Sequence, residues 1–590
     1  MTYERTSVAA PRLAGISLRL FAWWVERPIL GWAIRKILAK QAGFTALGEQ
    51  ESECIPLWAP LHSIPESSSG ERTDPAKLAE WAAGLEAGSD TGFRFETIQD
   101  FRQQYLSGRS TPLDLAGAFL AAVERSADGV MPMGIFVNQY ADDLLRQAEA
   151  STDRYRRGES LGPLDGVPVA VKDELDQIAY PTTAGTRVFG KEVATRDATS
   201  VARLRAAGAL LVGKTNMHEL GAGVTGLNPH HGPARNPYDP TRLTGGSSSA
   251  TAASVAAGLC PVAIGCDGGG SIRIPASLCG IVGLKATFGR VSEHGAFPLC
   301  WSVGHVGPFG ATARDAATAY ALIAGPDPSD PHTHHGPDVE LSGFEDRSLA
   351  GVRLGWYGPW FEDADSDVVR SCREHLEFLA SLGAEIVEVE VPRLDRARVV
   401  HLVTIVSEMC AGRRSDYLRF RRQFGHDIRV SLAIGYSLTG ADYVHALRHR
   451  RDIFDTLERI LGTVDGIITP STACTAPTIP LDGLATGETN LERLDNLMRF
   501  APIPNLTGHP AISFPVGYDS DGLPIGCQVI GRAWSESFLL RLAHLSEAVC
   551  ERRKPVFHEA ILASISNTSE SSGRVGSGSE GFSHGAGMSS

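Results

Sequence analysis

Short apolar runs alternate with helical patterns along most of the chain. The runs carry valine, isoleucine and leucine with few polar interruptions, which is typical of strands buried on both faces. They occupy residues 167–173, 209–216, 260–267, 352–357, 466–470 and 511–517. Helix-like segments lie between several of them, for example at 197–209 and 247–258. This order predicts an α/β fold whose largely parallel central sheet is covered by helices on both faces.

A capping pattern marks the start of one helix ahead of the first of these strands. Thr111 is followed by Pro112 and, two residues further on, by Asp114, before the segment LAGAFLAAVERS. Threonine accepts hydrogen bonds from the first free N–H groups of a helix, and proline fits its first position. We therefore expect a helix that begins at Pro112.

Residues 13–38 combine tryptophans and aliphatic side chains with arginine, lysine and glutamate. The longest charge-free run, 28–34, has seven residues, whereas a membrane-spanning helix needs about 20 apolar residues. A signal peptide is not expected either, because no small-residue cleavage site follows. Pro28 should divide the segment into two short amphipathic helices. Such helices either lie in a membrane interface or pack on the protein's own core or on a second subunit.

The composition changes at two further places and suggests three regions. Residues 1–95 form an N-terminal extension that ends in a connector rich in proline, serine and glutamate. Residues 96–563 contain the strand and helix patterns and are the expected catalytic domain. Residues 564–590 are rich in serine and glycine and cannot bury a core, so a disordered tail is expected.

The charge and the cysteine content limit the classes of ligand that the protein is expected to bind. The 590 residues are 43% hydrophobic and carry a formal net charge of −13, which argues against a nucleic-acid surface, since phosphates require a basic footprint. A small neutral or lipid substrate fits better. The ten cysteines are scattered without a C-x-x-C pair or histidines at zinc spacing. They are expected to be reduced thiols in a cytoplasmic protein, and neither a metal nor a cofactor is predicted.

Three segments at the ends of predicted strands carry candidate chemistry: GVPVAVKD with Lys172, TGGSSSATAASVAAG with Ser247 and Ser248, and CDGGGSIRIPASLCG with Ser271 and Arg273. A serine hydroxyl becomes a nucleophile when a neighbouring base takes its proton. No histidine falls in the Gly/Ser-rich runs. A lysine can be that base if burial leaves its amine uncharged, and Lys172 follows an apolar run.

Gly268, Gly269 and Gly270 directly precede Ser271. Glycines let the backbone bend so that successive N–H groups converge on one point, where an oxyanion could form. A plain glycine-rich turn and a phosphate-binding loop are the alternatives. The phosphate loop is disfavoured because neither G-x-x-x-x-G-K-[ST] nor a helix-opening G-x-G-x-x-G is present.

Taken together, these segments resemble the amidase signature family. The resemblance implies a single α/β/α domain with a mixed central sheet. It implies that Lys172 is the base, that Ser247 follows a cis peptide bond and passes the proton, and that Ser271 is the nucleophile. The family pattern further assigns supporting roles to Ser248 and Arg273.

The same resemblance assigns the oxyanion hole to the backbone N–H groups of Gly268, Gly269, Gly270 and Ser271. Two departures from the family pattern are present. Ser249-Ala250-Thr251 stands where the family usually has Gly-Gly or Gly-Ser after the paired serines, and Gly268 replaces a commoner threonine or isoleucine. Neither departure affects a residue with an expected catalytic role.

Segments outside the signature are similar to the plant-type fatty acid amide hydrolases, over roughly residues 10–562. They lie at 10–21, 217–239, 487–500 and 522–534. This likeness implies hydrolysis of N-acylethanolamines and related fatty amides, homodimerisation and peripheral membrane contact, for which residues 13–38 are the candidate. The alternatives are a general aryl or short-chain amidase, a glutaminase-type amidotransferase subunit and, in a different class, a catalytically silent lipid-binding or membrane-scaffold protein.

Overall fold

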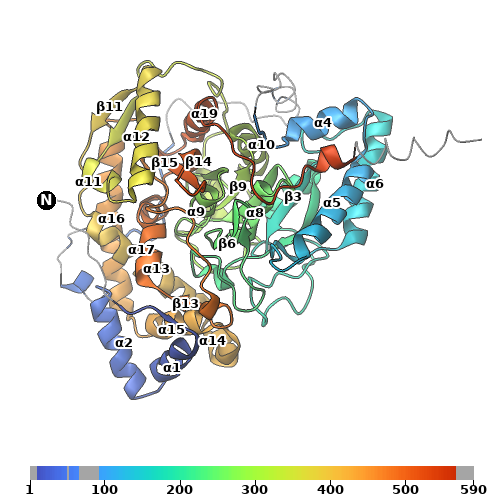
Figure 1. Ribbon diagram of the computed structural model, residues 1–590. Helices are drawn as coiled ribbons and strands as arrows, with labels where there is room; N and C mark the ends of the chain where they lie inside the picture. Colours follow the sequence, from blue (N-terminus) through green and yellow to red (C-terminus); the bar gives the residue numbers. More distant parts are fainter. Residues whose placement is uncertain are drawn as a thin grey trace, which may run out of the picture.

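A central sheet of eleven strands lies between layers of helices (Figure 1). The computed structural model describes residues 10–44, 46–49, 52, 54–64, 77, 81 and 92–565. In spatial order, the strands of the central sheet are β11 (Glu385–Glu388), β10 (Arg353–Trp356), β12 (Gly466–Pro470), β15 (Pro524–Gly531), β14 (Ala511–Tyr518), β8 (Val282–Lys285), β9 (Val306–Gly310), β7 (Val262–Cys266), β3 (Pro168–Lys172), β4 (Leu210–Thr215) and β2 (Phe136–Asn138). Two small sheets pair β1 (Leu13–Ala14) with β13 (Glu488–Thr489) and β5 (Arg235–Asn236) with β6 (Asp239–Leu243).

The central sheet is mixed. β3 runs parallel to β4 and β7, and β10 runs parallel to β11 and β12. The other neighbours, such as β14 with β15 and β7 with β9, are antiparallel. The expectation of a largely parallel sheet is therefore wrong, whereas the mixed sheet implied by the family resemblance is confirmed. An uninterrupted apolar run reports that a strand is buried on both faces; it carries no information on the direction of its neighbours.

Helices pack on the sheet, and a further group of helices lies beside it, at the lower left of the view (Figure 1). They are α4 (Ile98–Leu106), α5 (Pro112–Ala127), α6 (Ala141–Arg157), α7 (Thr199–Ala206), α8 (Ser249–Ala256), α9 (Arg273–Leu278), α10 (Ala313–Ile323), α11 (Gly358–Phe361), α12 (Ser366–Ser381), α13 (Leu394–Gly412), α14 (Arg414–Phe420), α15 (His426–Gly435), α16 (Gly440–Leu461), α17 (Leu491–Met498), α18 (Pro502–Thr507) and α19 (Glu536–Glu547). The predicted start of α5 is confirmed, since the Thr111 side chain accepts from the Asp114 N–H.

The N-terminal segment forms α1 (Gly15–Val25) and α2 (Leu30–Gln41), so the predicted break at Pro28 is confirmed. α1 packs against α15, where Leu18 and Ala22 contact Val430. An ion pair of 2.6 Å between Glu26 and Arg429 adds to this contact. One face of the helix pair is thus held on the protein itself.

Two findings concern the remaining regions. Among the described helices, none is both long and apolar enough to cross a membrane. Most of the predicted tail, residues 566–590, lies outside the described residues, and so does much of the predicted connector. The proposed boundaries of the three regions stay predictions.

Parallel pairing of β3 with β7 places two of the candidate segments together. Val169 on β3 is in register with Val262 on β7. Both strands are almost completely buried. Because parallel strands end at the same edge of a sheet, Lys172 at the end of β3 and the segment after Cys266 at the end of β7 share that edge.

Candidate active site

Lys172 and Ser247, predicted to act together, are in direct contact. Lys172 is the last residue of β3 and is fully buried, and its Nζ lies 2.8 Å from Ser247 Oγ. The peptide bond between Gly246 and Ser247 is cis, as the family resemblance implies. The carbonyl of Ser247 accepts a hydrogen bond of 3.1 Å from the His218 N–H. This hydrogen bond holds the backbone that carries the Ser247 hydroxyl.

Ser271 lies in the loop between β7 and α9 and lines the same cavity as Lys172 and Ser247. The loop needs its glycines for two reasons. Gly270 has a φ of +110°, a conformation that L side chains rarely adopt. A Cβ at Gly269 would lie 2.6 Å from the ring of His401. Close packing and backbone conformation, rather than mere flexibility, account for the glycine run.

His401 on α13 was not anticipated from the sequence. Its Nε2 lies 2.7 Å from the carbonyl oxygen of Gly268. Burial lowers the pKa of His401 to about 4, so the neutral ring donates Nε2–H to that carbonyl near pH 7. In a trans peptide the N–H points opposite to the C=O, so the Gly269 N–H points away from His401. No sequence signal connects these residues, which are far apart along the chain.

Asp267, just after β7, organises the rest of the loop. Its carboxylate accepts hydrogen bonds from the N–H groups of Gly270 (2.6 Å) and Ile272 (3.1 Å) and from the Arg273 guanidinium (3.0 Å). The Gly270 N–H is therefore engaged within the loop. Of the predicted oxyanion-hole donors, this leaves the N–H groups of Gly268, Gly269 and Ser271.

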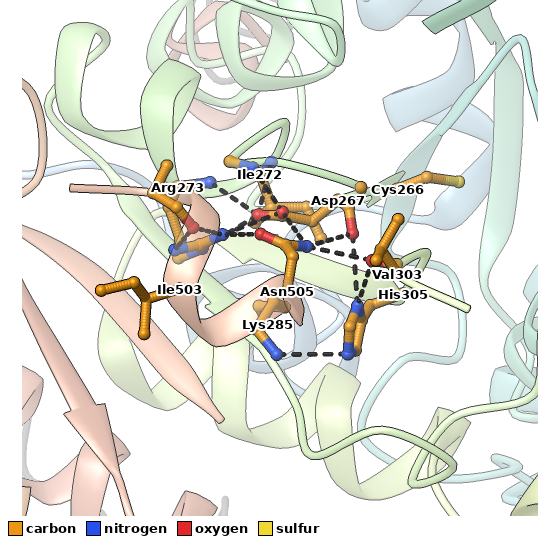
Figure 2. A network of polar contacts seen from close by, with 12 residues as sticks. Cys266, Asp267, Ile272, Arg273, Lys285, Val303, His305, Ile503 and Asn505 are labelled. Atoms are coloured by element: carbon orange, nitrogen blue, oxygen red, sulfur yellow. Dashed lines mark hydrogen bonds and ion pairs between the residues drawn. The ribbon is translucent and has the colours of Figure 1, made fainter. Parts of the chain in front are cut away.

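Arg273 is completely buried, and its guanidinium contacts Asp267 at the start of the loop (Figure 2). Its guanidinium donates to the Asn505 Oδ1 and Gln528 Oε1 atoms, each at 2.6 Å, and Asn505 donates in turn to Asp267 at 2.9 Å. Burial alone would raise the pKa of Asp267. The charge of Arg273 and the hydrogen bonds from Arg273 and Asn505 outweigh it and hold that pKa well below its ordinary value.

Ser248, the other predicted supporting residue, connects the two serine segments. Its hydroxyl donates to the carbonyl oxygen of Cys266 at 3.0 Å, and its N–H lies 3.4 Å from the carbonyl oxygen of Ser271. Ser248 thus fixes the distance between the Ser247 segment and the Ser271 loop without lining the cavity.

Glu174 is a second unanticipated residue. Its Oε2 lies 2.5 Å from Lys172 Nζ, and its side chain is 8% exposed. It stands two residues after Lys172, in the turn that follows β3. The amine of Lys172 thus contacts a carboxylate and a hydroxyl, and all three side chains line the cavity.

A cavity of about 380 Å³ opens over these residues. One part of its wall is apolar and comes from α13, α15 and α17, with Leu402, Ile405, Val406, Met409, Leu432, Leu494 and Met498. Another part carries polar groups from loops, among them Glu293, Asp330 and His332. Burial, together with the nearby carboxylates of Asp330 and Glu174, raises the pKa of Glu293 above its ordinary value.

The chain is similar to several known proteins in sequence and in structure. The family model described as Amidase matches residues 119–540. The chain is 41% identical to a protein named fatty acid amide hydrolase from Oryza sativa subsp. indica, over 95% of this chain and 97% of the relative. A protein of the same name from Arabidopsis thaliana is 37% identical over 96% of this chain and 97% of the relative.

Among solved structures, the crystal structure of a peptide amidase in complex with the competitive inhibitor chymostatin is similar, with a TM-score of 0.68 and 27% identity. The match covers 78% of this chain and 98% of the peptide amidase. The similarity therefore extends over nearly the whole length of that enzyme.

Proposed function

Because the chain belongs to the amidase family, we propose that it is a serine amidase that hydrolyses fatty acid amides, such as N-acylethanolamines, to a fatty acid and an amine. The observation that carries the proposal is the contact between Lys172 and Ser247 at a cavity that also holds Ser271 and an apolar wall.

In the proposed mechanism, Ser271 attacks the amide carbon while its proton passes to Ser247 and from there to Lys172. The carbonyl oxygen becomes an oxyanion that accepts hydrogen bonds from the N–H groups of the Ser271 loop. One such donor is typically worth about 3 kcal/mol of barrier height. His401 is proposed to fix the orientation of the Gly268–Gly269 peptide for this purpose.

The leaving group explains why the relay must be reversible. An amine is expelled only when its nitrogen is protonated, so the proton held at Lys172 has to return through Ser247. Water then attacks the acyl ester on Ser271, and the same path takes and returns its proton. Glu174, in contact with Lys172, is placed to balance the charge that forms on the amine.

The two parts of the cavity wall support a substrate with one apolar and one polar end. Aliphatic side chains from α13, α15 and α17 suit an acyl chain, because burying each CH₂ group contributes about 0.8 kcal/mol. The carboxyl group of Glu293 and the ring of His332 offer hydrogen bonds to a small polar amine such as ethanolamine.

A substrate panel tests this proposal. We expect kcat/KM for a long-chain N-acylethanolamine to exceed that for acetamide by several orders of magnitude, because acetamide leaves the apolar wall in contact with water. Rates would be measured for N-acylethanolamines of increasing chain length, with Ser271→Ala as the background control. A preference for acetamide, or an equal rate for all chain lengths, would contradict the substrate assignment and favour a general amidase.

We further propose that α1 and α2 place the protein on a membrane surface. Large side chains on and between the two helices are exposed to solvent: Ile16, Leu20, Trp23, Trp24, Ile29, Leu30, Trp32 and Ile37. Exposed cations accompany them: Arg19, Arg27, Lys36 and Lys40. This composition is typical of helices that lie in a bilayer interface. α15, on which α1 packs, also supplies Leu432 to the cavity wall, so a single helix connects α1 with the proposed acyl site.

A triple variant, Trp23→Ser/Trp24→Ser/Trp32→Ser, is expected to bind anionic liposomes at least tenfold more weakly than the wild type. Each substitution takes away an indole ring whose apolar surface would be buried in the bilayer interface. Sedimentation with liposomes would measure this. The control, Leu106→Ser/Val130→Ser, removes exposed apolar side chains at the end of α4 and just after α5. Both helices lie across the molecule from α1 (Figure 1), so binding should be unchanged. Equal binding by both variants would favour a partner protein on this face.

The homodimer implied by the family resemblance stays a prediction. The amidotransferase alternative is disfavoured because the similarity to the fatty acid amide hydrolases extends over the N-terminal helices as well as the catalytic region. Co-purification of the chain with a second type of subunit would favour it again.

A further inference from the structure

Two histidines and a glutamate from three distant segments meet outside the active site. His62 lies in the N-terminal connector, Glu458 on α16, and His509 two residues after the end of α18. His62 Nδ1 is 2.9 Å and His509 Nε2 is 3.1 Å from the same oxygen, Glu458 Oε1. In the part of the chain that the structure describes, this is the one group of three or more potential metal ligands whose ligand atoms lie within 4.8 Å of one another.

The second ring nitrogen of His62 determines what the first can do. Nε2 lies 2.9 Å from the carbonyl oxygen of Thr507. A carbonyl oxygen only accepts, so Nε2 carries a proton, and in the neutral ring the lone pair of Nδ1 faces Glu458. Histidines that bind metals usually donate their other N–H to a backbone carbonyl or carboxylate in this way, which fixes the tautomer.

Packing holds both rings in place. The His62 ring stacks on Phe454 with centroids 5.1 Å apart and meets the His509 ring edge-on at 4.5 Å. Both histidines are buried, whereas the Glu458 side chain is 46% exposed. The nitrogen ligands are therefore preorganised, and the oxygen ligand can adjust.

We propose that His62, Glu458 and His509 bind one zinc ion, with water as the fourth ligand. In a tetrahedral site with bonds of roughly 2.0–2.2 Å, ligand atoms are about 3.3–3.6 Å apart. The separations of 2.9 and 3.1 Å from Glu458 Oε1 reach this range if the exposed carboxylate moves outward by a few tenths of an ångström. Two imidazoles with one carboxylate suit Zn²⁺, whereas Mg²⁺ and Ca²⁺ prefer all-oxygen sites.

Such an ion fastens the connector to the catalytic domain. It joins the segment around His62 to α16 and to the end of α18. α18 also carries Asn505, which contacts Asp267 and Arg273 behind the Ser271 loop. Zinc bound here stabilises the connector that follows α1 and α2. It also stabilises the position of α18, whose Asn505 contacts the residues that hold the Ser271 loop. The sequence could not reveal this site, because Glu458 lies 396 residues after His62 along the chain and His509 lies further still.

The experiment uses the full-length protein, freed of metal with EDTA and dialysed. We expect it to take up one equivalent of Zn²⁺, measured by elemental analysis after gel filtration. Co²⁺ as a probe should give the intense visible absorption of a four-coordinate site, and the melting temperature should rise with added Zn²⁺. Glu458→Gln should weaken Zn²⁺ binding at least tenfold. This variant keeps the shape of an exposed side chain, so its fold is not at risk.

His544→Ala is the matched control, because His544 pairs with Glu547 on α19, away from the cluster. This variant should bind Zn²⁺ as the wild type does. Failure of the wild type to bind one equivalent, or equal affinity in the wild type and Glu458→Gln, would overturn the proposal. The three side chains would then only be hydrogen-bonded to one another. The readouts are metal content and spectra, so this outcome is independent of whether the chain hydrolyses fatty amides.

Discussion

Lys172→Met is expected to lower kcat/KM for a fatty amide by roughly 100- to 10,000-fold, the range that a positioned acid–base group contributes. Methionine fills the same space but can neither take the proton from Ser247 nor return it to the amine. An ester of the same acid should lose less, because its alkoxide leaving group depends less on protonation than an amine does. Paired amide and ester rates, measured across pH, test both statements.

A variant of a buried charge needs a control for stability. Lys172→Met leaves the nearly buried carboxylate of Glu174 without its partner, and such an unpaired charge destabilises the fold. The double variant Lys172→Met/Glu174→Gln removes the amine and the carboxylate together. We expect it to melt near the wild-type temperature and to stay as inactive as the single variant. Activity restored in the double variant would mean that Lys172 acts structurally.

The residues with expected catalytic roles could be located from the sequence because each stands at the end of a recognisable strand or in a glycine-serine run. Lys172 follows an apolar run that proved to be β3, and Ser271 follows β7 through the glycine loop. The contact between Lys172 and Ser247, by contrast, depends on how distant segments pack. Only the family resemblance brought these two residues together in advance.

Residues that shape the site from elsewhere could not be found in this way. His401 reaches Gly268 from α13, and its own sequence surroundings are those of an ordinary helix. Asn505 on the short helix α18 is similar in this respect. Glu174 is only two residues from Lys172, but it lies in the turn after β3, and no pattern in the sequence indicates that this turn brings its carboxylate to the amine. The directions of the strands could not be predicted for a related reason. The hydrophobicity of a strand indicates that it is buried, but not whether its neighbours run parallel or antiparallel to it.

Asp267→Asn is expected to destabilise the protein by about 3–5 kcal/mol, because it leaves Arg273 charged and buried without its counter-ion. The activity of the folded protein should fall as well, by roughly 100-fold, since Asp267 holds the N–H groups of Gly270 and Ile272 on either side of Ser271 and small displacements of a nucleophile are costly. Urea unfolding and kcat of the same samples would measure both effects.

The difference in stability between the wild type and Asp267→Asn depends on pH in a direction that follows from the pKa of Asp267. The pKa of Asp267 is depressed in the folded state, so its stabilising contribution is present above the unfolded pKa of about 3.9 and is lost only as the pH falls through the lower folded value. The gap in stability between the wild type and Asp267→Asn should therefore be constant from about pH 5 to 9.

Asp165→Asn is the matched control for this prediction. Asp165 is also buried and paired with an arginine, Arg154, but it precedes β3 at the end opposite to Lys172 and does not line the cavity. Arg154 is 20% exposed and can turn to water once its partner is lost. We expect this variant to lose less stability and to keep the kcat of its folded fraction. An equal loss of kcat in both variants would mean that global destabilisation, and not the geometry of the Ser271 loop, limits turnover.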